Sequence, residues 1–251
     1  MDFDIERVRE AYPGRAVDWL QTTQSTMKDA WVAAQSGAIS GSLVGAEEQT
    51  AGQGRLGRVW HSAAGKGLYF TLVLRVKLQL AELPVLTIAL GLAVAEAVRV
   101  QTGLVCDLKW PNDLLINGRK CSGILSEFQD GVILAGIGLN VNQAEFPPEL
   151  SHVATSLRVE GEVEYSRESL LICLLEEVDK HVALLESQGK KPLLDLFTHG
   201  SSFVRGKRVE VEQSGRVITG VTDGMSDAGF LYVRQADGER VLILAGGLKA
   251  I

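Results

Sequence analysis

The segment from Gly52 to Gly57 most constrains how this chain can fold. Its spacing, G-x-G-x-x-G, is that of a dinucleotide-binding turn, which requires a strand before it and a helix that begins on it. The run "SLVGAEE" at 42–48 predicts the strand, but the residues after Gly57 read as a turn and then as the β-rich run "GLYFTLVLRV" at 67–76. The sequence therefore predicts a glycine loop between two strands and excludes a Rossmann turn.

The same loop carries two arginines, Arg55 and Arg58. Glycines let the backbone approach a ligand closely and free amides that bind anions. A guanidinium adds a fixed cationic fork suited to carboxylate or phosphate. A surface turn with solvated arginines explains the loop equally well when it is taken alone. A P-loop is excluded, because Gly65-Lys66 is followed by Gly67 rather than by Ser or Thr.

The charge balance limits the partners. The chain has 251 residues, is 46% apolar and carries a formal net charge of −6. A mildly acidic chain is unsuited to general nucleic-acid binding, so we expect no DNA partner, and phosphate chemistry needs a local cluster of cations. The charged N-terminal run "MDFDIERVRE" has no apolar core, so it predicts no signal peptide.

Cysteine usage and hydropathy favour a cytoplasmic protein. Cys106, Cys121 and Cys173 are an odd number and lack metal-ligand spacing, which disfavours a disulfide framework or a zinc site and fits reduced thiols. The most apolar run, 83–95, is bounded by a glutamate on each side and is shorter than the ~20 residues of a membrane span. We therefore expect a buried helix here and no membrane association.

Periodicity and breakers outline the secondary structure. Apolar or amphipathic runs predict helices at 26–36, after an N-cap at Ser25, and at 83–102 and 166–187. The Asn117-Gly118 pair predicts a β-hairpin. Several hairpins beside a few helices indicate an α+β fold, in which a mixed, largely antiparallel sheet has flanking helices.

The composition changes after about Ser201. From there the chain reads as short alternating strands joined by turns such as Ser214-Gly215, which is typical of a small β-barrel. We therefore expect a larger α/β domain at 1–200 and a small β-barrel domain at 201–251.

A second group of polar residues lies in "KWPNDLLINGRKCSGILSEF" at 109–128 and in "GIGLNVN" at 136–142. Pro111 fixes the backbone of the first loop, and Gly123 inside the next strand indicates close approach by a ligand or another backbone. Each feature alone has an ordinary explanation: solvated lysines, a buried tryptophan and glycine bulges. Together with the glycine loop they favour a binding site. The polar candidates are Lys109, Asn112, Asp113, Lys120 and Asn140.

Four segments in order, "STMKDA", "EEQTAGQGRLGRVWHS", "KWPNDLLINGRKCSGILSEF" and "GIGLNVN", resemble the signature segments of biotin protein ligases. The resemblance covers about residues 20–142, and the tail is similar to the C-terminal domain of that family. It implies a class II synthetase-like fold with a small SH3-like barrel. Some members carry an N-terminal operator-binding domain. Because the first signature helix begins near Ser25, we expect the ligase-only form, without that domain.

The resemblance implies a cytoplasmic, ATP-dependent ligase that works in two steps. Biotin and ATP give biotinyl-5′-adenylate and pyrophosphate, and the biotin then passes to a lysine of a biotin carboxyl carrier protein, such as a subunit of acetyl-CoA carboxylase. Mg²⁺ is expected with ATP, but the sequence identifies no metal ligands. It also leaves open whether the chain forms a homodimer.

The resemblance also implies roles for individual residues. Asp113 has two equally supported interpretations, a base for the acceptor lysine or a turn residue. Gln53 departs from the arginine that many members carry there. Trp60 is implied to cover adenine, with a buried core side chain as the alternative. The implied biotin-binding residues are Ser25, Thr26, Met27, Gln49, Gly52, Gln53, Arg55, Lys120 and Gly123. The implied nucleotide-binding residues are Arg58, Trp60, Lys109, Asn112 and Asn140, and the implied catalytic residues are Lys120, Arg55 and Asp113.

Two other functions fit the sequence less well. A lipoate or octanoate ligase or transferase of the same superfamily needs a long apolar tunnel, and Ser25, Thr26 and Gln49 argue against one. A biotin or nucleotide sensor without catalysis would not need Lys120 and Arg55, both of which are present.

Overall fold

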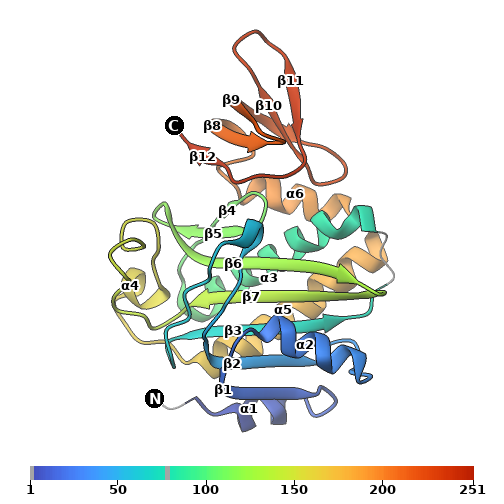
Figure 1. Ribbon diagram of the computed structural model, residues 1–251, viewed down its shortest axis with the longest axis vertical. Coiled ribbons are helices and arrows are strands. Elements are labelled where there is room, and N and C mark those ends of the chain that lie inside the picture. Colours follow the sequence, from blue (N-terminus) through green and yellow to red (C-terminus); the bar gives the residue numbers. More distant parts are fainter. Residues whose placement is uncertain (1–2, 77–79) are drawn as a thin grey trace.

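A seven-stranded mixed sheet forms the centre of the computed structural model, which describes residues 3–76 and 80–251 (Figure 1). The strand order is β1-β2-β3-β7-β6-β5-β4. β1 runs parallel to β2, and every other neighbouring pair is antiparallel, which confirms the predicted mixed, largely antiparallel sheet. The strands are β1 Val17–Thr23, β2 Leu43–Gln49, β3 Gly67–Leu74, β4 Asp107–Lys109, β5 Asp113–Ile116, β6 Arg119–Gln129 and β7 Val132–Asn140.

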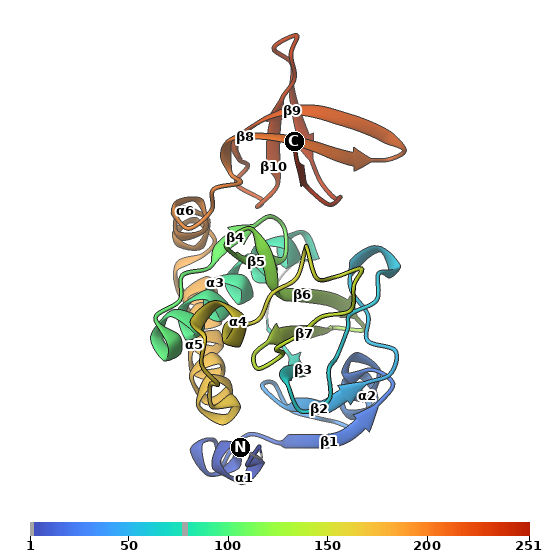
Figure 2. The ribbon, with the colours of Figure 1, turned by 90° about the vertical axis from the view of Figure 1, so that its left-hand side faces the viewer.

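Helices cover both faces of this sheet. Figure 2 shows α3 (Leu83–Thr102) and α5 (Arg167–Gln188) on one side and α2 (Thr26–Gln35) on the other. α3 has the length and composition of a membrane-spanning helix, but most of it is buried among the other elements. An apolar helix without a polar face belongs in a core, so the predicted buried helix is confirmed.

The predicted helix ends and turns are confirmed where the signal is local. α3 ends before Gly103, whose φ of 76° is in the left-handed region that glycine favours. α5 begins after the N-cap Ser166, whose hydroxyl accepts a hydrogen bond from the Ser169 N–H. Asn117 and Gly118 have φ values of 50° and 78°, as a two-residue hairpin turn requires.

Other elements were not predicted. These are α1 (Ile5–Ala11), β1, α4 (Leu157–Gly161) and α6 (Lys191–His199). The edge strand β1 buries only its first residue, Val17, so its sequence lacks the alternation that identifies a half-buried strand. The strand expected at 104–110 is only three residues long, as β4. Two 3₁₀ turns, Arg55–Gly57 and Leu80–Glu82, complete the described helices.

A second, five-stranded antiparallel sheet lies beside the first, in the order β11-β10-β9-β8-β12. This confirms a β-rich C-terminal part, while the boundary between residues 200 and 201 stays a prediction. The two parts share buried contacts: the Trp110 indole N–H donates to the Gly229 carbonyl at 2.9 Å. The strands are β8 Arg205–Gln213, β9 Arg216–Met225, β10 Leu231–Arg234, β11 Arg240–Ile243 and β12 Lys249–Ala250.

Glu47 joins three elements of the larger part. Its carboxylate accepts a hydrogen bond from the Trp19 indole on β1 at 2.7 Å and pairs with the Arg167 guanidinium of α5 at 2.8 Å. The Arg167 and Glu47 side chains are only 6% and 14% exposed. Removing one partner of such a pair leaves the other charge buried without compensation.

Replacing Glu47 by alanine is therefore expected to lower the free energy of unfolding by about 3–5 kcal/mol. Urea denaturation followed by circular dichroism measures this change. Asp195→Ala is the control, because it breaks an exposed pair with Lys191 and should cost less than about 1 kcal/mol. Equal losses in the two variants would contradict the expected role of burial.

Candidate functional site

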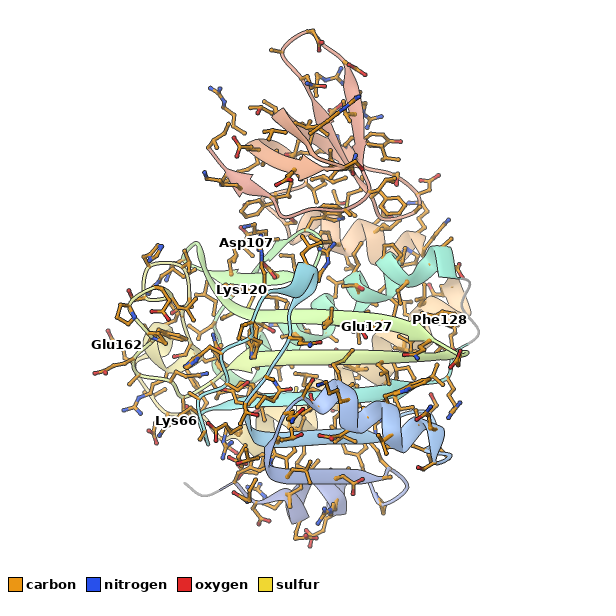
Figure 3. The ribbon with its side chains drawn as sticks, in the orientation of Figure 1. Lys66, Asp107, Lys120, Glu127, Phe128 and Glu162 are labelled. Atoms are coloured by element: carbon orange, nitrogen blue, oxygen red, sulfur yellow. The ribbon has the colours of Figure 1, made fainter. Side chains whose placement is uncertain are left out.

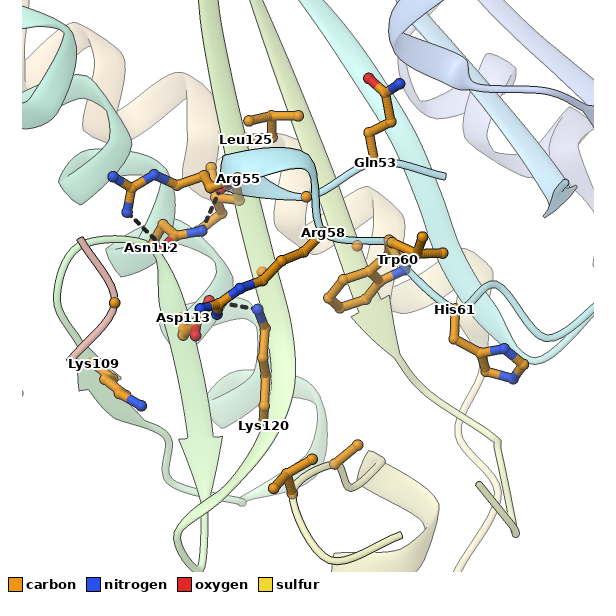
Figure 4. A pocket seen from close by; sticks show the side chains of 18 of the residues that line it. Gln53, Arg55, Arg58, Trp60, His61, Lys109, Asn112, Asp113, Lys120 and Leu125 are labelled. Atoms are coloured by element: carbon orange, nitrogen blue, oxygen red, sulfur yellow. Dashed lines mark hydrogen bonds and ion pairs between the residues drawn. The ribbon is translucent and has the colours of Figure 1, made fainter. Parts of the chain in front are cut away.

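One cavity of about 750 Å³ collects nearly all of the predicted site residues. It lies on the sheet face where the glycine loop crosses β6 and β7 (Figure 4). Gly52 is the exception and does not line the cavity. The predicted residues that line it are Ser25, Thr26, Met27, Gln49, Gln53, Arg55, Arg58, Trp60, Lys109, Asn112, Asp113, Lys120, Gly123 and Asn140.

The glycine loop is a short turn folded back on itself. The Gly54 N–H donates to the Arg58 carbonyl at 2.7 Å, and the Trp60 N–H donates to the Gly52 carbonyl at 2.9 Å. A Cβ at Gly52 would lie 2.8 Å from the Trp60 carbonyl oxygen, so this position needs glycine for close backbone approach. β2 precedes the loop and β3 follows it, which confirms a loop between two strands.

Glycines on β6 and β7 make room for the side chains that lie on the sheet. A Cβ at Gly138 would lie 2.4 Å from the Trp60 indole, and a Cβ at Gly123 would lie 2.9 Å from the Lys120 side chain. Trp60 is half-buried and lines the cavity, so it is not a fully buried core side chain. Its indole nitrogen Nε1 is buried and has no hydrogen-bond partner among the described residues.

An ion pair lies at the centre of the cavity. Lys120 Nζ is 2.5 Å from Asp113 Oδ1 and 5.4 Å from the centroid of the Trp60 ring. Figure 4 shows the Arg58 side chain extending toward this pair, and Figure 3 shows Lys120 at the opposite end of β6 from Phe128. Among the described residues, Asp113 is the one acidic side chain in the lining, so the cations there outnumber it.

Burial affects the cations unequally. Burial lowers the pKa of Arg55, an effect that Asp113 opposes and Arg58 adds to. Burial also lowers the pKa of Lys109, where Asp113 again opposes the shift and Lys120 and Arg58 add to it. Cations that repel each other in a partly desolvated cavity favour an anionic ligand, which would relieve this repulsion.

Polar groups at the start of α2 form one corner of the cavity. Gln49 Oε1 accepts from the Thr26 N–H at 2.9 Å, which satisfies a free amide of the first helical turn. The Thr26 hydroxyl bonds to Thr71 Oγ1 at 2.9 Å. Ser25 is the N-cap by position, but its hydroxyl makes no capping bond. Its Oγ is buried without a hydrogen-bond partner in the described part of the chain, so it is free to bind a polar ligand.

The two asparagines already hold protein groups. Asn112 Nδ2 donates to the Ile124 carbonyl at 2.8 Å, and Asn112 Oδ1 accepts from Arg55 Nη1 at 3.2 Å. Asn140 Nδ2 donates to the Thr155 carbonyl at 3.0 Å, and its Oδ1 accepts from Gln143 at 3.1 Å. Both residues support loops around the cavity, and a contact with nucleotide stays a prediction.

Two further segments line the cavity that the sequence did not point to. Gly246–Ala250, at the end of the second sheet, includes Lys249, and a Cβ at Gly247 would lie 3.4 Å from Arg58 Nη2. The other segment, 146–154, contributes apolar side chains and His152. Neither carries a motif with a known spacing, so only the tertiary structure reveals them.

The cavity does not form a cage for a metal ion. In residues 3–76 and 80–251, no group of three or more His, Cys, Asp or Glu side chains is placed to hold one. Mg²⁺ is a hard cation that prefers several oxygen ligands, and Asp113 is already paired with Lys120.

Comparisons with known proteins agree with this geometry. Residues 19–143 match the model of the biotin/lipoate A/B protein ligase family, and residues 205–246 match the biotin protein ligase C-terminal domain. The chain is 35% identical over 246 residues to a biotin--[acetyl-CoA-carboxylase] ligase of Mycobacterium tuberculosis, a match that covers 92% of this chain and 88% of the relative. It is 34% identical over 232 residues to the bifunctional ligase/repressor BirA of Bacillus subtilis, covering 90% and 71%.

A solved structure is similar over nearly the whole chain. The biotin protein ligase from Aquifex aeolicus, in complex with biotin and ATP, has a TM-score of 0.84 at 30% identity. The match covers 94% of this chain and 98% of that one, so it includes both sheets.

Adding one methyl group at Gly138 tests the packing of Trp60. Gly138→Ala is expected to displace the indole, because the new Cβ would overlap it. The Nε1–H resonance of Trp60, assigned with Trp60→Phe, should shift in an ¹⁵N correlation spectrum. Gly91→Ala is the matched control, since a Cβ there meets side chains only at 3.7 Å or more. An unmoved resonance in Gly138→Ala would contradict the packing.

Proposed function

This chain belongs to the biotin protein ligase family and uses biotin and ATP as a biotin ligase, and from this premise we propose how its cavity performs the two half-reactions. The observation that carries the proposal is the convergence of Lys120, Arg55, Arg58 and Lys109 on one cavity of a chain whose net charge is −6. The sections of chain that supply these cations lie far apart in sequence, so the fold concentrates them.

In the first half-reaction two anions must meet. The biotin carboxylate attacks the α-phosphorus of ATP, an acyl–phosphate bond forms, and pyrophosphate leaves. Lys120 and the Arg55 backbone would hold the carboxylate, and Arg58 and Lys109 would face the phosphates. Cations fixed before the reaction stabilise charge in the transition state without reorganising. The Lys120–Asp113 pair at 2.5 Å leaves an ammonium that can also bind a second carboxylate.

The polar corner would bind biotin, and Trp60 would bind the adenine of ATP. The unpartnered Ser25 hydroxyl, beside Thr26 and Gln49, suits the ureido group of biotin, which both donates and accepts hydrogen bonds. The Trp60 ring lies beside Lys120 in Figure 4, where it would stack on adenine, and its Nε1 has no partner among the described residues.

In the second half-reaction a lysine amine of a carrier protein attacks the acyl carbon, and AMP leaves with the bonding electrons. The attacking amine must lose a proton. Asp113 is the acidic side chain of the described lining, so we assign to it the orientation of the amine and the acceptance of that proton.

Mg²⁺ and the carrier belong to the proposal as well. The described residues around the cavity do not form a metal cage, so Mg²⁺ would enter on the triphosphate of ATP. The carrier proposed is a biotin carboxyl carrier protein, in keeping with the name of the M. tuberculosis relative. Two statements stay predictions: a cytoplasmic location and the absence of a DNA partner. Whether the chain forms a homodimer stays open.

Incubation with biotin, ATP, Mg²⁺ and a carrier domain is expected to add one biotin to the carrier, as measured by its intact mass. Lipoate in place of biotin should give no product. Lys120→Ala should slow labelling by about 10²–10³-fold, because it removes a cation from the developing charge. Lys191→Ala, an exposed lysine of α6, serves as the control. Undiminished labelling by Lys120→Ala would remove Lys120 from the mechanism.

Asp113→Asn separates the two half-reactions. It keeps the shape of the side chain but cannot accept a proton, so transfer from purified biotinyl-5′-adenylate to the carrier should fall by about 10²–10⁴-fold. Pyrophosphate release in the first half-reaction should fall much less. Asp107→Asn, on the adjacent strand and bonded to Ser202, is the matched control. Equal losses in both half-reactions would favour the turn role of Asp113 instead.

A further inference from the structure

The backbone of Lys120 is bracketed by the loop that leads into α4. The Lys120 N–H donates to the Val153 carbonyl at 2.8 Å, and the Thr155 N–H donates to the Lys120 carbonyl at 2.9 Å. This short parallel bridge lies beside a shift in the β5–β6 register, and such irregularities redirect the neighbouring side chains. The direction of the Lys120 side chain therefore depends on how firmly this loop is held against β6.

Glu160 on α4 holds the segments on both sides of Lys120. Its carboxylate accepts hydrogen bonds from Thr155 Oγ1 at 2.5 Å, Arg119 Nη2 at 2.8 Å and Asn117 Nδ2 at 2.6 Å. Asn117 lies in the β5–β6 turn, Arg119 is the first residue of β6, directly before Lys120, and Thr155 belongs to the loop that brackets Lys120. The Glu160 side chain is 4% exposed, so its carboxylate is largely shielded from water.

The carboxylate of Glu160 is charged when it makes these contacts. Burial acts to raise its pKa, but the hydrogen bonds from Thr155 and Asn117 and the charge of Arg119 outweigh burial, so the pKa is lowered. Neither Glu160 nor any of the three side chains that it binds is among the residues that line the cavity. Any effect on the reaction must therefore pass through the residues that it holds.

We propose that Glu160 is a positioning residue for Lys120: it joins the β5–β6 turn to the 153–155 loop and so fixes the point from which the ammonium reaches the biotin carboxylate. The inference rests on the proposed role of Lys120 in adenylate formation. Its physical basis is the steep dependence of rate on geometry, since a displacement of about 1 Å at a reacting group costs about 10²-fold.

A double-mutant cycle tests the proposal. Glu160→Ala should slow biotinyl-5′-adenylate formation by about 10- to 100-fold through kcat, while KM for ATP changes little, because the phosphate contacts of Arg58 are untouched. In the Lys120→Ala background the same substitution should cause no further loss, because the group that Glu160 positions is already absent. The rate of pyrophosphate release measures the effect of Glu160→Ala in the wild-type and in the Lys120→Ala backgrounds.

Additive losses would overturn the proposal, because a role in folding alone would reduce activity equally with and without Lys120. Wild-type activity in folded Glu160→Ala would overturn it as well. Glu168→Ala is the matched control: this buried carboxylate accepts from the Asp4 N–H and the Ser166 hydroxyl, away from the cavity. It should lower the melting temperature and leave kcat per folded molecule unchanged.

Two milder variants keep the test decisive if Glu160→Ala does not fold. Thr155→Val removes one of the three donors with little change of shape, and Glu160→Gln keeps one acceptor oxygen but loses the charge opposite Arg119. Each should slow kcat less than alanine would and lose its effect in the Lys120→Ala background. If wild-type protein forms no adenylate, the proposed function fails, whereas additive losses in an active enzyme contradict only the role of Glu160.

Discussion

The site depends on the contact between the Trp60 indole and two glycines of the sheet. Gly138 on β7 and Gly123 on β6 leave the space that the indole and the Lys120 side chain occupy. Protein interiors are packed so closely that one added methyl group displaces its neighbours. Because the indole lies directly on the strands, the glycine loop that carries it is held over the cavity, and the arginines of that loop come within reach of the Lys120–Asp113 pair.

The same packing brings several positively charged side chains together in a partly buried cavity. A chain with a net charge of −6 places several lysines and arginines around one cavity, with Asp113 as the acidic side chain in the described lining. Burial penalises the charged forms of Arg55 and Lys109, so the free site is electrostatically unfavourable and an anion improves it. Packing of the sheet against α3 offsets the unfavourable free energy of bringing these cations together.

The sequence predicted the features that local chemistry determines. The bounds of α3 and the hairpin at Asn117-Gly118 follow from breakers and turn residues that act over a few positions. The glycine loop and the segments 109–128 and 136–142, which the sequence grouped as a predicted binding site, all contribute residues to the lining of one cavity. These segments carry several motifs in a fixed order. Spacing alone did not distinguish a binding loop from a surface turn, and the resemblance to a family supplied the roles of individual residues.

Features that depend on distant parts of the chain were not predictable. Nothing near Ser25 shows that its capping role passes to Gln49, 24 positions later, leaving the serine hydroxyl free. Nothing near Glu160 shows that it binds both the Asn117 turn and the Thr155 loop. The edge strands β1 and β4 form because neighbouring strands offer partners, and their own sequences indicate little.

The lining contributed by Gly246–Ala250 has a consequence for the order in which the protein matures. Because translation runs from the N-terminus, the lining residues between Ser25 and Ala154 are synthesised well before residues 246–250. A nascent chain that has already folded its larger sheet still has a cavity open on one side. The full lining of the cavity therefore forms only after residues 246–250 have been synthesised and β12 has paired with β8.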